Sequence, residues 1–544
     1  MPLDDTRALT LAWSSALDLA AEEHGDKPAF HFGGQGWDAT LSFATWSHLS
    51  HLAADALEKL GVGRGDRVAV LAPGGPVYPI LQTACSELGA IIVPINTRYR
   101  LDELEYVFGL AEPTVIVSIA RFHTTDYLAL IRSALSALPG REPRLVAIPQ
   151  SDILADAQPD LPGEFTWSAF LDLGRDADSR LRAPSADDSV LLQFTSGSTA
   201  FPKGALLSNR ASLGATYHLG RRMDIVADDV YFSTQPLYHV GGSVATTLMA
   251  LAHGCTMVVP ERYSPEEVFR LVPRYACTVR TGQAAMYAME FAHPDFDPAI
   301  FATVVKGWAG GTPEFKQVIA DTLGIPALTT IYGLTETAGS TTVTATDDTP
   351  EVWARSCGSA LPGLEVGVQV DGSVVSTAGQ VGEICVRGWS VMDGYFRNPE
   401  ATAEAIDPDG WFHTGDLGSL DEAGNLYFVD RIKDMIKPGG ENVSAAEVER
   451  VIGDLPSVAQ VAVIGMPDAR LGEVPVAFVE AKPGAVVDAE AIIEYCRSRM
   501  ASFKVPTRVF AVHDWPMTES GKIVKRELAS RLPDSDVGNI GKAG

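Results

Sequence analysis

Residues 190–204 read Val-Leu-Leu-Gln-Phe-Thr-Ser-Gly-Ser-Thr-Ala-Phe-Pro-Lys-Gly. The apolar beginning predicts a short buried strand, and the hydroxyl and small residues after it predict a turn. Such a turn directs backbone N–H groups and hydroxyls toward one point, which suits a polyphosphate, and Lys203 adds a positive charge beside it. Gly204 follows the lysine, so the stretch is not a Walker A loop. Taken alone, a turn of this composition is more often an ordinary connection than a phosphate site.

Strands and helices alternate on both sides of this turn. Apolar runs predict strands at 67–71, 90–94, 114–117 and 230–233. Helical periodicity predicts helices at 12–23, 46–60, 77–88, 101–110, 208–221 and 265–272. The alternation predicts an α/β fold in which a large N-terminal domain is built on mostly parallel sheets.

The texture of the chain changes after Gly358. Gly, Val and turn residues dominate 359–426 and predict a small β-rich subdomain of short antiparallel strands. A compact α+β domain is predicted beyond it, with helices at 445–452 and 488–499 and strands at 461–464 and 476–479. We therefore divide the chain into an N-terminal domain (1–430), a boundary at 431–433, a small C-terminal domain (434–533) and a loose tail (534–544).

Composition excludes several classes of protein. A chain of 544 residues exceeds one ordinary core, and 46% hydrophobic with 20% charged residues is typical of a globular protein. The net charge of −27 argues against nucleic acid as a partner. No apolar run approaches the roughly 20 residues that span a bilayer, and the six cysteines include no CxxC pair. Together with the acidic first residues, these features predict a cytoplasmic protein without a transmembrane segment.

Four further motifs carry residue types that suit a nucleotide. Residues 332–337 (Tyr-Gly-Leu-Thr-Glu-Thr) offer an aromatic face, a hydroxyl and a carboxylate at a predicted strand end. Residues 411–417 (Trp-Phe-His-Thr-Gly-Asp-Leu) place a carboxylate after a Gly turn, where it can bind ribose hydroxyls. The charged cluster 430–437 and the Gly turn 516–523, which presents Lys522, complete the set. Each motif alone is also typical of a helix start, a surface charge cluster or a solvated lysine.

All five motifs in this order resemble the adenylate-forming, or AMP-binding, superfamily. That superfamily contains acyl- and aryl-CoA synthetases, luciferases and the adenylation domains of peptide synthetases. The resemblance extends over about residues 10 to 530 and includes 309–313 (Ala-Gly-Gly-Thr-Pro), Gly382-Glu383 and Gly394-Tyr395. Ala200 departs from the pattern, because glycine is commoner there, but Lys203 and the hydroxyls are retained.

The resemblance implies a substrate or cofactor role for each matched position. The ATP β- and γ-phosphates would be held by Thr195, Ser196, Gly197, Ser198, Thr199 and Lys203. Adenine would lie between Tyr332 and the backbone of Gly310 and Gly311. Thr335 would contact the α-phosphate, and Glu336 would bind Mg²⁺. The ribose would be fixed by Asp416 and Arg431, and Lys522 would bridge the substrate carboxylate and the α-phosphate.

The resemblance also implies two half-reactions. A carboxylate attacks the α-phosphate and expels pyrophosphate, and a thiol, expected to be coenzyme A, then attacks the acyl-adenylate and expels AMP. In the family the small domain rotates between these steps, and Lys433 matches the hinge, which makes 431–433 the predicted hinge. After the rotation Lys522 would leave the site and the segment with Gly439 and Gly440 would face it; Lys437 is assigned to the same group of nucleotide contacts.

The acyl pocket in relatives is lined by matches to Tyr238, His239, Val240, Gly241, Thr281, Gly282, Ala284, Ala285, Trp308, Ala309, Ile331, Gly333 and Ala338. None of these side chains carries a negative charge, which argues against an α-amino acid as substrate. His239 is predicted to gate the acyl tunnel, with a packed aromatic role as the alternative. The sequence therefore predicts a CoA ligase for an apolar acid, whether fatty, cyclic or aromatic.

The sequence is also compatible with three other functions. The acyl group could pass to a carrier protein or an amine in place of coenzyme A, although the chain has no fused carrier domain. A luciferase-like oxygenase shares every motif named above. A non-catalytic nucleotide-binding protein is disfavoured because Lys203, Glu336, Asp416 and Lys522 are all present. A homodimer is compatible with the sequence, which does not determine the oligomeric state.

Overall fold

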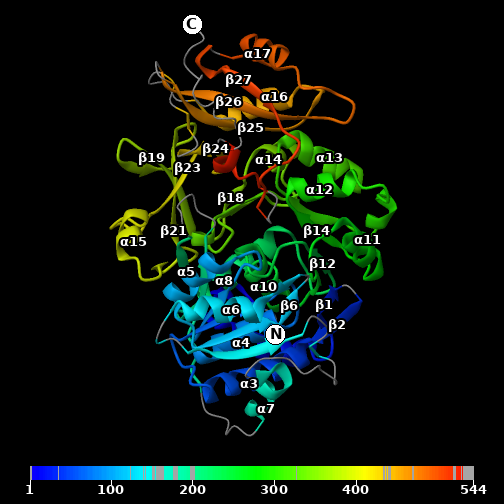
Figure 1. The fold of residues 1–544 in the computed structure, drawn as a ribbon, viewed down its shortest axis with the longest axis vertical. Coiled ribbons are helices and arrows are strands. Elements are labelled where there is room, and N and C mark those ends of the chain that lie inside the picture. The colour runs from blue at the N-terminus through cyan, green and yellow to red at the C-terminus, as the bar shows by residue number, and fades with distance from the viewer. Residues whose placement is uncertain are drawn as a thin grey trace. The chain divides into compact units, whose positions relative to one another are not determined.

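The computed structural model describes residues 3–34, 36–122, 124–138, 140, 142–149, 153–154, 165–175, 182–195, 202–325, 328–432, 435–436, 438, 443–468, 471–500, 502–518, 522–528 and 530. The chain forms two compact units. The first comprises Met1–Val366 and Val386–Phe412, and the second comprises Gly367–Cys385 and His413–Gly544. Figure 1 shows the ribbon coloured along the chain.

An eight-stranded sheet in the first unit has the strand order β22-β11-β10-β4-β3-β5-β8-β9. Its strands are β3 (Arg67–Leu71), β4 (Ile91–Pro94), β5 (Val115–Ile119), β8 (Arg144–Ile148), β9 (Phe165–Thr166), β10 (Ser189–Phe194), β11 (Gly204–Ser208) and β22 (Gly394–Tyr395). The pairs from β10 to β9 are parallel, whereas β11 and β22 are antiparallel strands at one edge. Apolar, fully buried runs such as β5 are typical of a parallel sheet covered on both faces.

A second sheet in this unit has six strands, in the order β15-β14-β12-β13-β1-β2. Its strands are β1 (Pro28–Gly34), β2 (Trp37–Ser42), β12 (Val230–Ser233), β13 (Thr256–Pro260), β14 (Val279–Gly282) and β15 (Lys306–Ala309). All pairs are parallel except the hairpin of β1 and β2. The remaining strands are β6 (Arg121–Phe122), β7 (Thr125–Asp126), β16 (Ile331–Tyr332), β17 (Thr342–Val343) and β18 (Ser359–Ala360), and they pair antiparallel.

The helices of the first unit precede, connect or follow its strands. They are α1 (Asp5–Thr10), α2 (Trp13–His24), α3 (Phe43–Lys59), α4 (Val77–Leu88), α5 (Leu101–Ala111), α6 (Tyr127–Ser136), α7 (Trp167–Gly174), α8 (Asn209–Arg222), α9 (Val240–Ser243), α10 (Thr247–His253), α11 (Pro265–Arg274), α12 (Ala284–Phe291), α13 (Pro313–Leu323), α14 (Pro350–Arg355) and α15 (Pro399–Ala405), with the 3₁₀ turns η1 (Pro298–Phe301) and η2 (Thr335–Thr337). Local chemistry sets several of the ends. Ser208 caps α8 by accepting a hydrogen bond from the Ala211 N–H, and Gly89 ends α4 with a φ of 65°.

Two separate sheets belong wholly or mostly to the second unit. One has the order β20-β19-β21-β23-β24, formed by β19 (Leu364–Val370), β20 (Ser373–Val375), β21 (Val381–Gly388), β23 (Phe412–Leu420) and β24 (Leu426–Arg431). The other has the order β25-β26-β27, formed by β25 (Val458–Asp468), β26 (Gly472–Ala481) and β27 (Arg508–Ala511). Helices α16 (Ala445–Gly453), α17 (Ala489–Arg497) and α18 (Lys525–Leu528) and the turn η5 (Ser502–Lys504) complete the unit; α16, α17 and the second sheet are orange in Figure 1.

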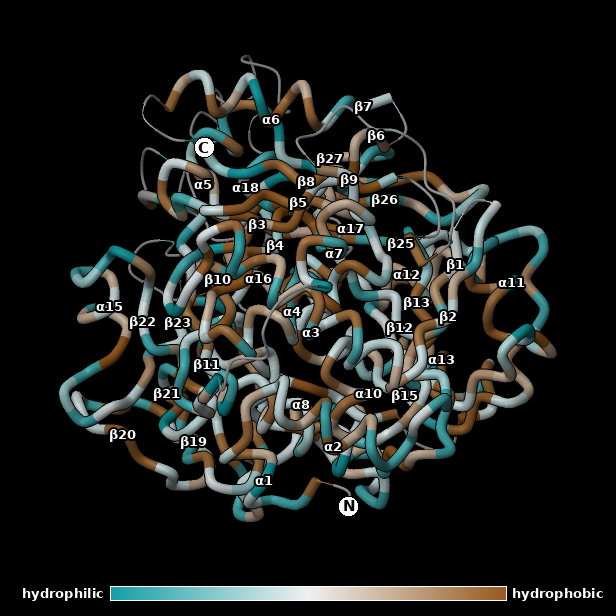
Figure 2. The backbone as a smooth tube through the Cα atoms, turned by 90° about the horizontal axis from the view of Figure 1, so that it is seen from below, coloured by the Kyte–Doolittle hydropathy of each residue, from teal (hydrophilic) through white to brown (hydrophobic). Residues whose placement is uncertain are grey.

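Burial follows the apolar pattern of the sequence. The largest core of the first unit includes Trp13, Trp46, Tyr78 and Phe108, each with no exposed surface. Figure 2 shows hydrophobic stretches of the tube, in brown, along the central strands β3 and β5. The second unit has its own cores, one of them around Ile436, Val448 and Val463.

The predicted fold class is confirmed, with mostly parallel sheets in a large N-terminal part and an α+β C-terminal part. The structure divides the chain by contacts, and the predicted boundaries at 430 and 433 stay a prediction. The predicted tail from 534 lies outside the described residues.

Candidate active site

The phosphate turn predicted from the sequence is closed by two paired strands. Strands β10 and β11 are antiparallel neighbours, and the Thr195 N–H donates to the Lys203 carbonyl over 2.8 Å directly beyond them. This bond joins the two ends of the turn, so a long loop is held at its base. Between these ends, Ser196, Gly197, Ser198 and Thr199 lie outside the described residues.

Lys203 and Glu336 are linked through Tyr395. The Lys203 ammonium lies over the Tyr395 ring, 4.7 Å from its centroid. The Tyr395 hydroxyl donates to Glu336 Oε1 over 2.8 Å. Burial, the charge of Glu336 and this hydrogen bond all raise the pKa of Tyr395, which keeps the phenol protonated and able to donate. Tyr395 therefore connects the Lys203 ammonium to the Glu336 carboxylate, although the three residues are far apart in the sequence.

Backbone contacts hold Tyr395 in this position. Strand β22 pairs with β11, with Tyr395 opposite Ala205. The Phe396 N–H donates to the Gly204 carbonyl over 2.8 Å, and the Met392 N–H donates to the Glu336 carbonyl over 2.8 Å. The ring is thus attached to both the phosphate turn and the turn that carries Glu336.

The turn that carries Thr335 and Glu336 follows strand β16, whose last residue is the buried Tyr332. The Leu334 N–H donates to the Thr337 hydroxyl over 3.0 Å, which closes the turn η2. Gly333 must be glycine here, because a Cβ atom would lie 2.6 Å from the Gly339 backbone carbon. The close approach explains how a tight turn can present a ring, a hydroxyl and a carboxylate within five residues.

Gly310 and Gly311 follow β15, where the Gly310 N–H donates to the Gly282 carbonyl over 3.2 Å. Gly311 has a φ of 129°, a conformation that only glycine adopts readily. A Cβ atom at Gly310 would lie 2.3 Å from Gln283 Oε1, so the Gln283 side chain occupies the space that a larger residue would need. Glycine at both positions therefore lets this segment pack closely against Gln283 and Ala284, and the adenine contact stays a prediction.

Four of the predicted acyl-pocket residues, Thr281, Gly282, Trp308 and Ala309, lie at the carboxyl ends of the parallel strands β14 and β15. Thr281 pairs with Ser233 on one side and with Trp308 on the other, which aligns the ends of β12, β14 and β15. Carboxyl ends of parallel strands are where α/β sheets bind ligands. His239 caps α9, and its Nδ1 accepts a hydrogen bond from the Gly241 N–H over 3.2 Å. The ring hydrogen is therefore on Nε2.

A fully buried ion pair lies beneath this strand end. Arg280 and Glu290 form an ion pair with no exposed side-chain surface on either residue. The Arg280 guanidinium also lies over the Tyr287 ring at 4.7 Å. The Tyr287 hydroxyl contacts the carbonyls of Arg280 (3.1 Å) and Trp308 (3.2 Å). Arg280 and Tyr287 thus hold the backbone of β14 and β15, the strands that carry the predicted pocket residues Thr281 and Trp308.

In the second unit, the predicted ribose residues are direct neighbours. Asp416 on β23 is opposite Arg431 on β24, and Arg431 Nε lies 3.2 Å from Asp416 Oδ1. Asp416 is buried, whereas the Arg431 side chain is 42% exposed. The exposed guanidinium side leaves room for a ligand, while the pair holds the carboxylate in place.

Lys522 belongs to the same group of charges. Its pKa is lowered by desolvation of the ammonium and by the charge of Arg431, while Asp416 raises it, although the residue as a whole is exposed. The Lys522 N–H donates to the Thr518 hydroxyl over 3.0 Å, and the Thr518 N–H donates back to the Lys522 carbonyl over 2.7 Å. The Lys522 ammonium is therefore within electrostatic range of the pair formed by Asp416 and Arg431.

Two carboxylates support the strands of this group. Glu383 Oε1 accepts from the Gly415 N–H over 2.9 Å, which holds the turn before Asp416. Asp430 Oδ2 accepts from the Ser444 hydroxyl over 2.6 Å and from the Ala446 N–H over 3.2 Å, at the start of α16. The predicted residues Lys433, Lys437, Gly439 and Gly440 lie outside the described residues.

Sequence reasoning assigned no role to Tyr395 and overlooked the buried pair of Arg280 and Glu290. The Gly394-Tyr395 dipeptide was part of the family pattern, and that was the available signal. Arg280 gave no signal, because an isolated charge in an apolar strand identifies no partner.

Family comparisons cover most of the chain. A model described as "AMP-binding enzyme" matches residues 17–396, and one described as "AMP-binding enzyme C-terminal domain" matches residues 447–522. Among the described helices, none combines the length and apolarity that crossing a membrane requires.

Individual relatives match over nearly the full length. A 3-[(3aS,4S,7aS)-7a-methyl-1,5-dioxo-octahydro-1H-inden-4-yl]propanoyl:CoA ligase from Rhodococcus jostii is 36% identical over 522 residues, covering 94% of this chain and 97% of that protein. The mitochondrial medium-chain acyl-CoA ligase ACSF2 of Rattus norvegicus is 30% identical over 510 residues, covering 90% and 83%. The crystal structure of ATP-bound MatB from Rhodopseudomonas palustris superposes with a TM-score of 0.81 at 27% identity, covering 95% and 99%.

Proposed function

Because the chain belongs to the AMP-binding enzyme family and to its acyl-CoA synthetase branch, we propose that it joins an apolar cyclic or medium-chain carboxylic acid to coenzyme A at the expense of ATP. The enzyme class, an AMP-forming acid–thiol ligase, follows from the family and the curated relatives. The choice of acid and the roles of individual residues are the new part of the proposal.

The observation that supports the residue roles is the ion pair of Asp416 and Arg431, whose charges act on the Lys522 ammonium. A carboxylate is a weak nucleophile, and the α-phosphate of ATP repels it. A lysine that binds both groups offsets this repulsion and aligns them, which is catalysis by positioning and electrostatics. Lys522 takes this role, and Asp416 with Arg431 holds the ribose.

The first unit supplies the remaining contacts in the proposal. Lys203 and the phosphate turn bind the β- and γ-phosphates, and Tyr332 with the backbone of Gly310 and Gly311 binds adenine. Thr335 contacts the α-phosphate. The carboxylate oxygen attacks the α-phosphorus, the bond to pyrophosphate breaks, and an acyl-adenylate forms.

Glu336 fits a magnesium ion. Its Oε1 is held by Tyr395, so Oε2 is the hard oxygen ligand that magnesium prefers. A bound magnesium ion neutralises phosphate charge. In the second half-reaction the sulfur of coenzyme A attacks the acyl carbonyl, AMP leaves, and the thiol proton is released.

The nature of the acid is inferred from the strand ends around Thr281. The pocket residues named from the sequence combine the small residues Gly241, Gly282 and Ala284 with the rings of Tyr238, His239 and Trp308. None of the pocket residues named from the sequence bears a carboxylate that could pair with an amino group. The Rhodococcus relative acts on a propanoyl side chain attached to a bicyclic ring, which supports a bulky apolar acid here.

Separate assays of the two half-reactions test the proposal. Lys522→Ala is expected to abolish acid-dependent pyrophosphate release, yet to retain most of the thioester formation from supplied acyl-adenylate. The matched control is Lys482→Ala, an exposed lysine of the same unit, which should leave both rates unchanged. Equal loss in both half-reactions would refute the role of Lys522.

Product analysis with wild-type protein tests the acceptor and the acid. Acyl-CoA with AMP, formed best from cyclic or medium-chain acids, supports the proposal. Acyl-adenylate without thioester would shift the acceptor to a carrier protein or an amine. Absence of any pyrophosphate release across a panel of acids would favour a non-catalytic nucleotide-binding protein.

A further inference from the structure

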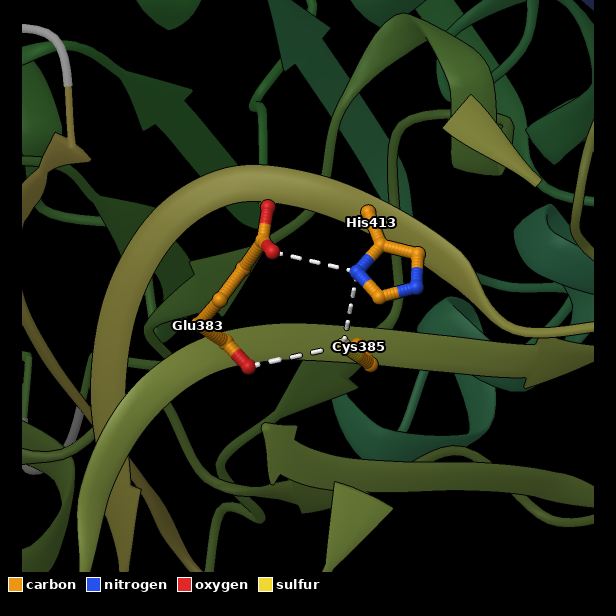
Figure 3. Close-up of side chains that lie close together, drawn as sticks. All are labelled: Glu383, Cys385 and His413. Carbon is orange, nitrogen blue, oxygen red and sulfur yellow. Dashed lines mark hydrogen bonds and ion pairs between the residues drawn. The ribbon is translucent and has the colours of Figure 1, made fainter. Parts of the chain in front are cut away.

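Three side chains that can bind a metal ion meet on two neighbouring strands of the second unit. Glu383 and Cys385 are on β21, and His413 is on the adjacent strand β23. Residues two apart on a strand point to the same face, so Glu383 and Cys385 both project toward His413. Figure 3 shows this convergence, and the ligand atoms of the three residues lie within 4.8 Å of one another.

The distances between these atoms resemble the edges of a tetrahedral metal site. Zinc bonds of about 2.0–2.1 Å to nitrogen and about 2.3 Å to sulfur place the two ligand atoms about 3.5 Å apart. Cys385 Sγ lies 3.6 Å from His413 Nδ1. His413 Nδ1 lies 3.0 Å from Glu383 Oε2, so a separation of a few tenths of an ångström more would admit an ion.

Burial and charge also suit a bound cation. Cys385 is completely buried, whereas His413 and Glu383 retain 17% and 19% exposed side-chain surface, which gives an ion a route to the site. Glu383 Oε1 is already engaged by the Gly415 N–H, so Oε2 is the oxygen that faces the other two ligands. The ligand positions are held by the sheet and by this hydrogen bond, so little ordering is needed on binding.

We propose that Glu383, Cys385 and His413 form a binding site for a soft or borderline divalent cation of the zinc type. One thiolate, one imidazole and one carboxylate form a ligand set that favours zinc or cobalt over magnesium. Water supplies the fourth ligand. The site is distinct from Glu336, which has only oxygen to offer, so one protein can bind magnesium with its nucleotide and zinc between β21 and β23.

Binding of the cation displaces protons from Cys385 and His413. The thiol of Cys385 now donates to the Glu383 carbonyl over 3.5 Å, and this proton is released when sulfur binds the cation. Binding of the cation at His413 Nδ1 requires a neutral ring with its hydrogen on Nε2, so any hydrogen between Nδ1 and Glu383 Oε2 moves to Nε2 or is released to water. The cation thus replaces the hydrogens that connect the three side chains.

The consequence for the protein is a cross-link between two strands. His413 lies three residues before Asp416, and Glu383 holds the turn between them. A cation at this site therefore ties the ribose-binding strand β23 to β21 and stabilises the second unit by its binding free energy.

Cobalt titration of the full-length protein tests the site without ATP, acid or coenzyme A. Wild type is expected to bind one Co²⁺ with a thiolate-to-cobalt absorption band, which Zn²⁺ abolishes and excess Mg²⁺ does not. Cys385→Ser should lose the band, and His413→Gln should weaken binding by at least about tenfold, since even the loss of an outer-shell partner of a metal ligand typically costs that much. Cys357→Ser, at a half-buried cysteine, is the matched control and should behave as wild type.

Two results would overturn the proposal. One is the absence of the charge-transfer band in wild-type protein, and the other is an unchanged band in Cys385→Ser. If Cys385→Ser fails to fold, the wild-type titration and His413→Gln still decide the question. Because no step uses the ligase reaction, failure of the metal site is separate from failure of the proposed function.

Discussion

Replacing Tyr395 by phenylalanine tests how the first unit prepares Glu336 for magnesium. The substitution removes the 2.8 Å hydrogen bond to Glu336 Oε1 and keeps the ring that lies beneath the Lys203 ammonium. A hydrogen bond to a charged group contributes about 1.5–3 kcal/mol. Both residues are only half-buried, so water can replace the phenol, and the lower value applies. A loss of about 1.5 kcal/mol corresponds to roughly tenfold weaker binding.

The assay measures acid-dependent pyrophosphate release at several magnesium concentrations. Tyr395→Phe should require roughly tenfold more magnesium for half-maximal rate, with a smaller change at saturating magnesium. Calorimetry of Mg·ATP binding without acid should show the same loss, independent of turnover. Tyr395→Leu also removes the ring that contacts Lys203, so it should bind Mg·ATP more weakly still than Tyr395→Phe.

The matched control is Tyr127→Phe. The Tyr127 hydroxyl donates to the Thr97 carbonyl over 2.6 Å, so this variant loses a comparable phenol hydrogen bond outside the proposed site. It should keep the wild-type magnesium dependence. If Tyr395→Phe shows that dependence as well, Tyr395 does not position Glu336 and the reasoning is wrong.

Two further predictions concern stability. Burial lowers the pKa of Lys316 to about 8 from its ordinary 10.5, so between these values the unfolded chain binds more protons and stability rises with pH. Measured by urea unfolding, the free energy of unfolding of the wild type should rise by at most about 3 kcal/mol between pH 8 and 10.5 relative to that of Lys316→Met. A difference between the two proteins that does not change with pH would contradict this. Glu290→Gln should destabilise the protein by about 3–5 kcal/mol, because it leaves the Arg280 charge buried and unpaired. Glu266→Gln, at a carboxylate that is 66% exposed, should change unfolding little, and equal losses in the two variants would refute the argument.

Much of the fold was predictable because it is local. Strands β3 and β12 and helix α4 have the predicted bounds, 67–71, 230–233 and 77–88. Each is an apolar run or a helical pattern bounded by turn residues, so neighbouring residues suffice to define it.

The contacts that assemble the site were less predictable because they are non-local. Strand β22 has two residues and pairs with β11 almost two hundred residues earlier in the chain, so no periodicity reveals it. Without this pairing Tyr395 cannot be placed next to Glu336. The ribose pair was easier, since Asp416 and Arg431 belong to consecutive strands of one hairpin.

The buried ion pair was invisible for a different reason. Arg280 is within a strand and Glu290 within the following helix, and charged residues in a sequence are ordinarily expected to be exposed. Only the packed structure shows that the two charges neutralise each other. Side chains that act by supporting others therefore leave little trace in a single sequence.

The division of the chain into units has a mechanical consequence. The polypeptide passes between them three times, after Val366, after Cys385 and after Phe412. Residues 431–433 lie within the second unit, so a rotation about them would separate the part of that unit before residue 431 from the part after residue 433. The Asp430 carboxylate accepts hydrogen bonds from Ser444 and Ala446, which lie on the other side of residues 431–433. Each such rotation would therefore have to break and re-form these two hydrogen bonds.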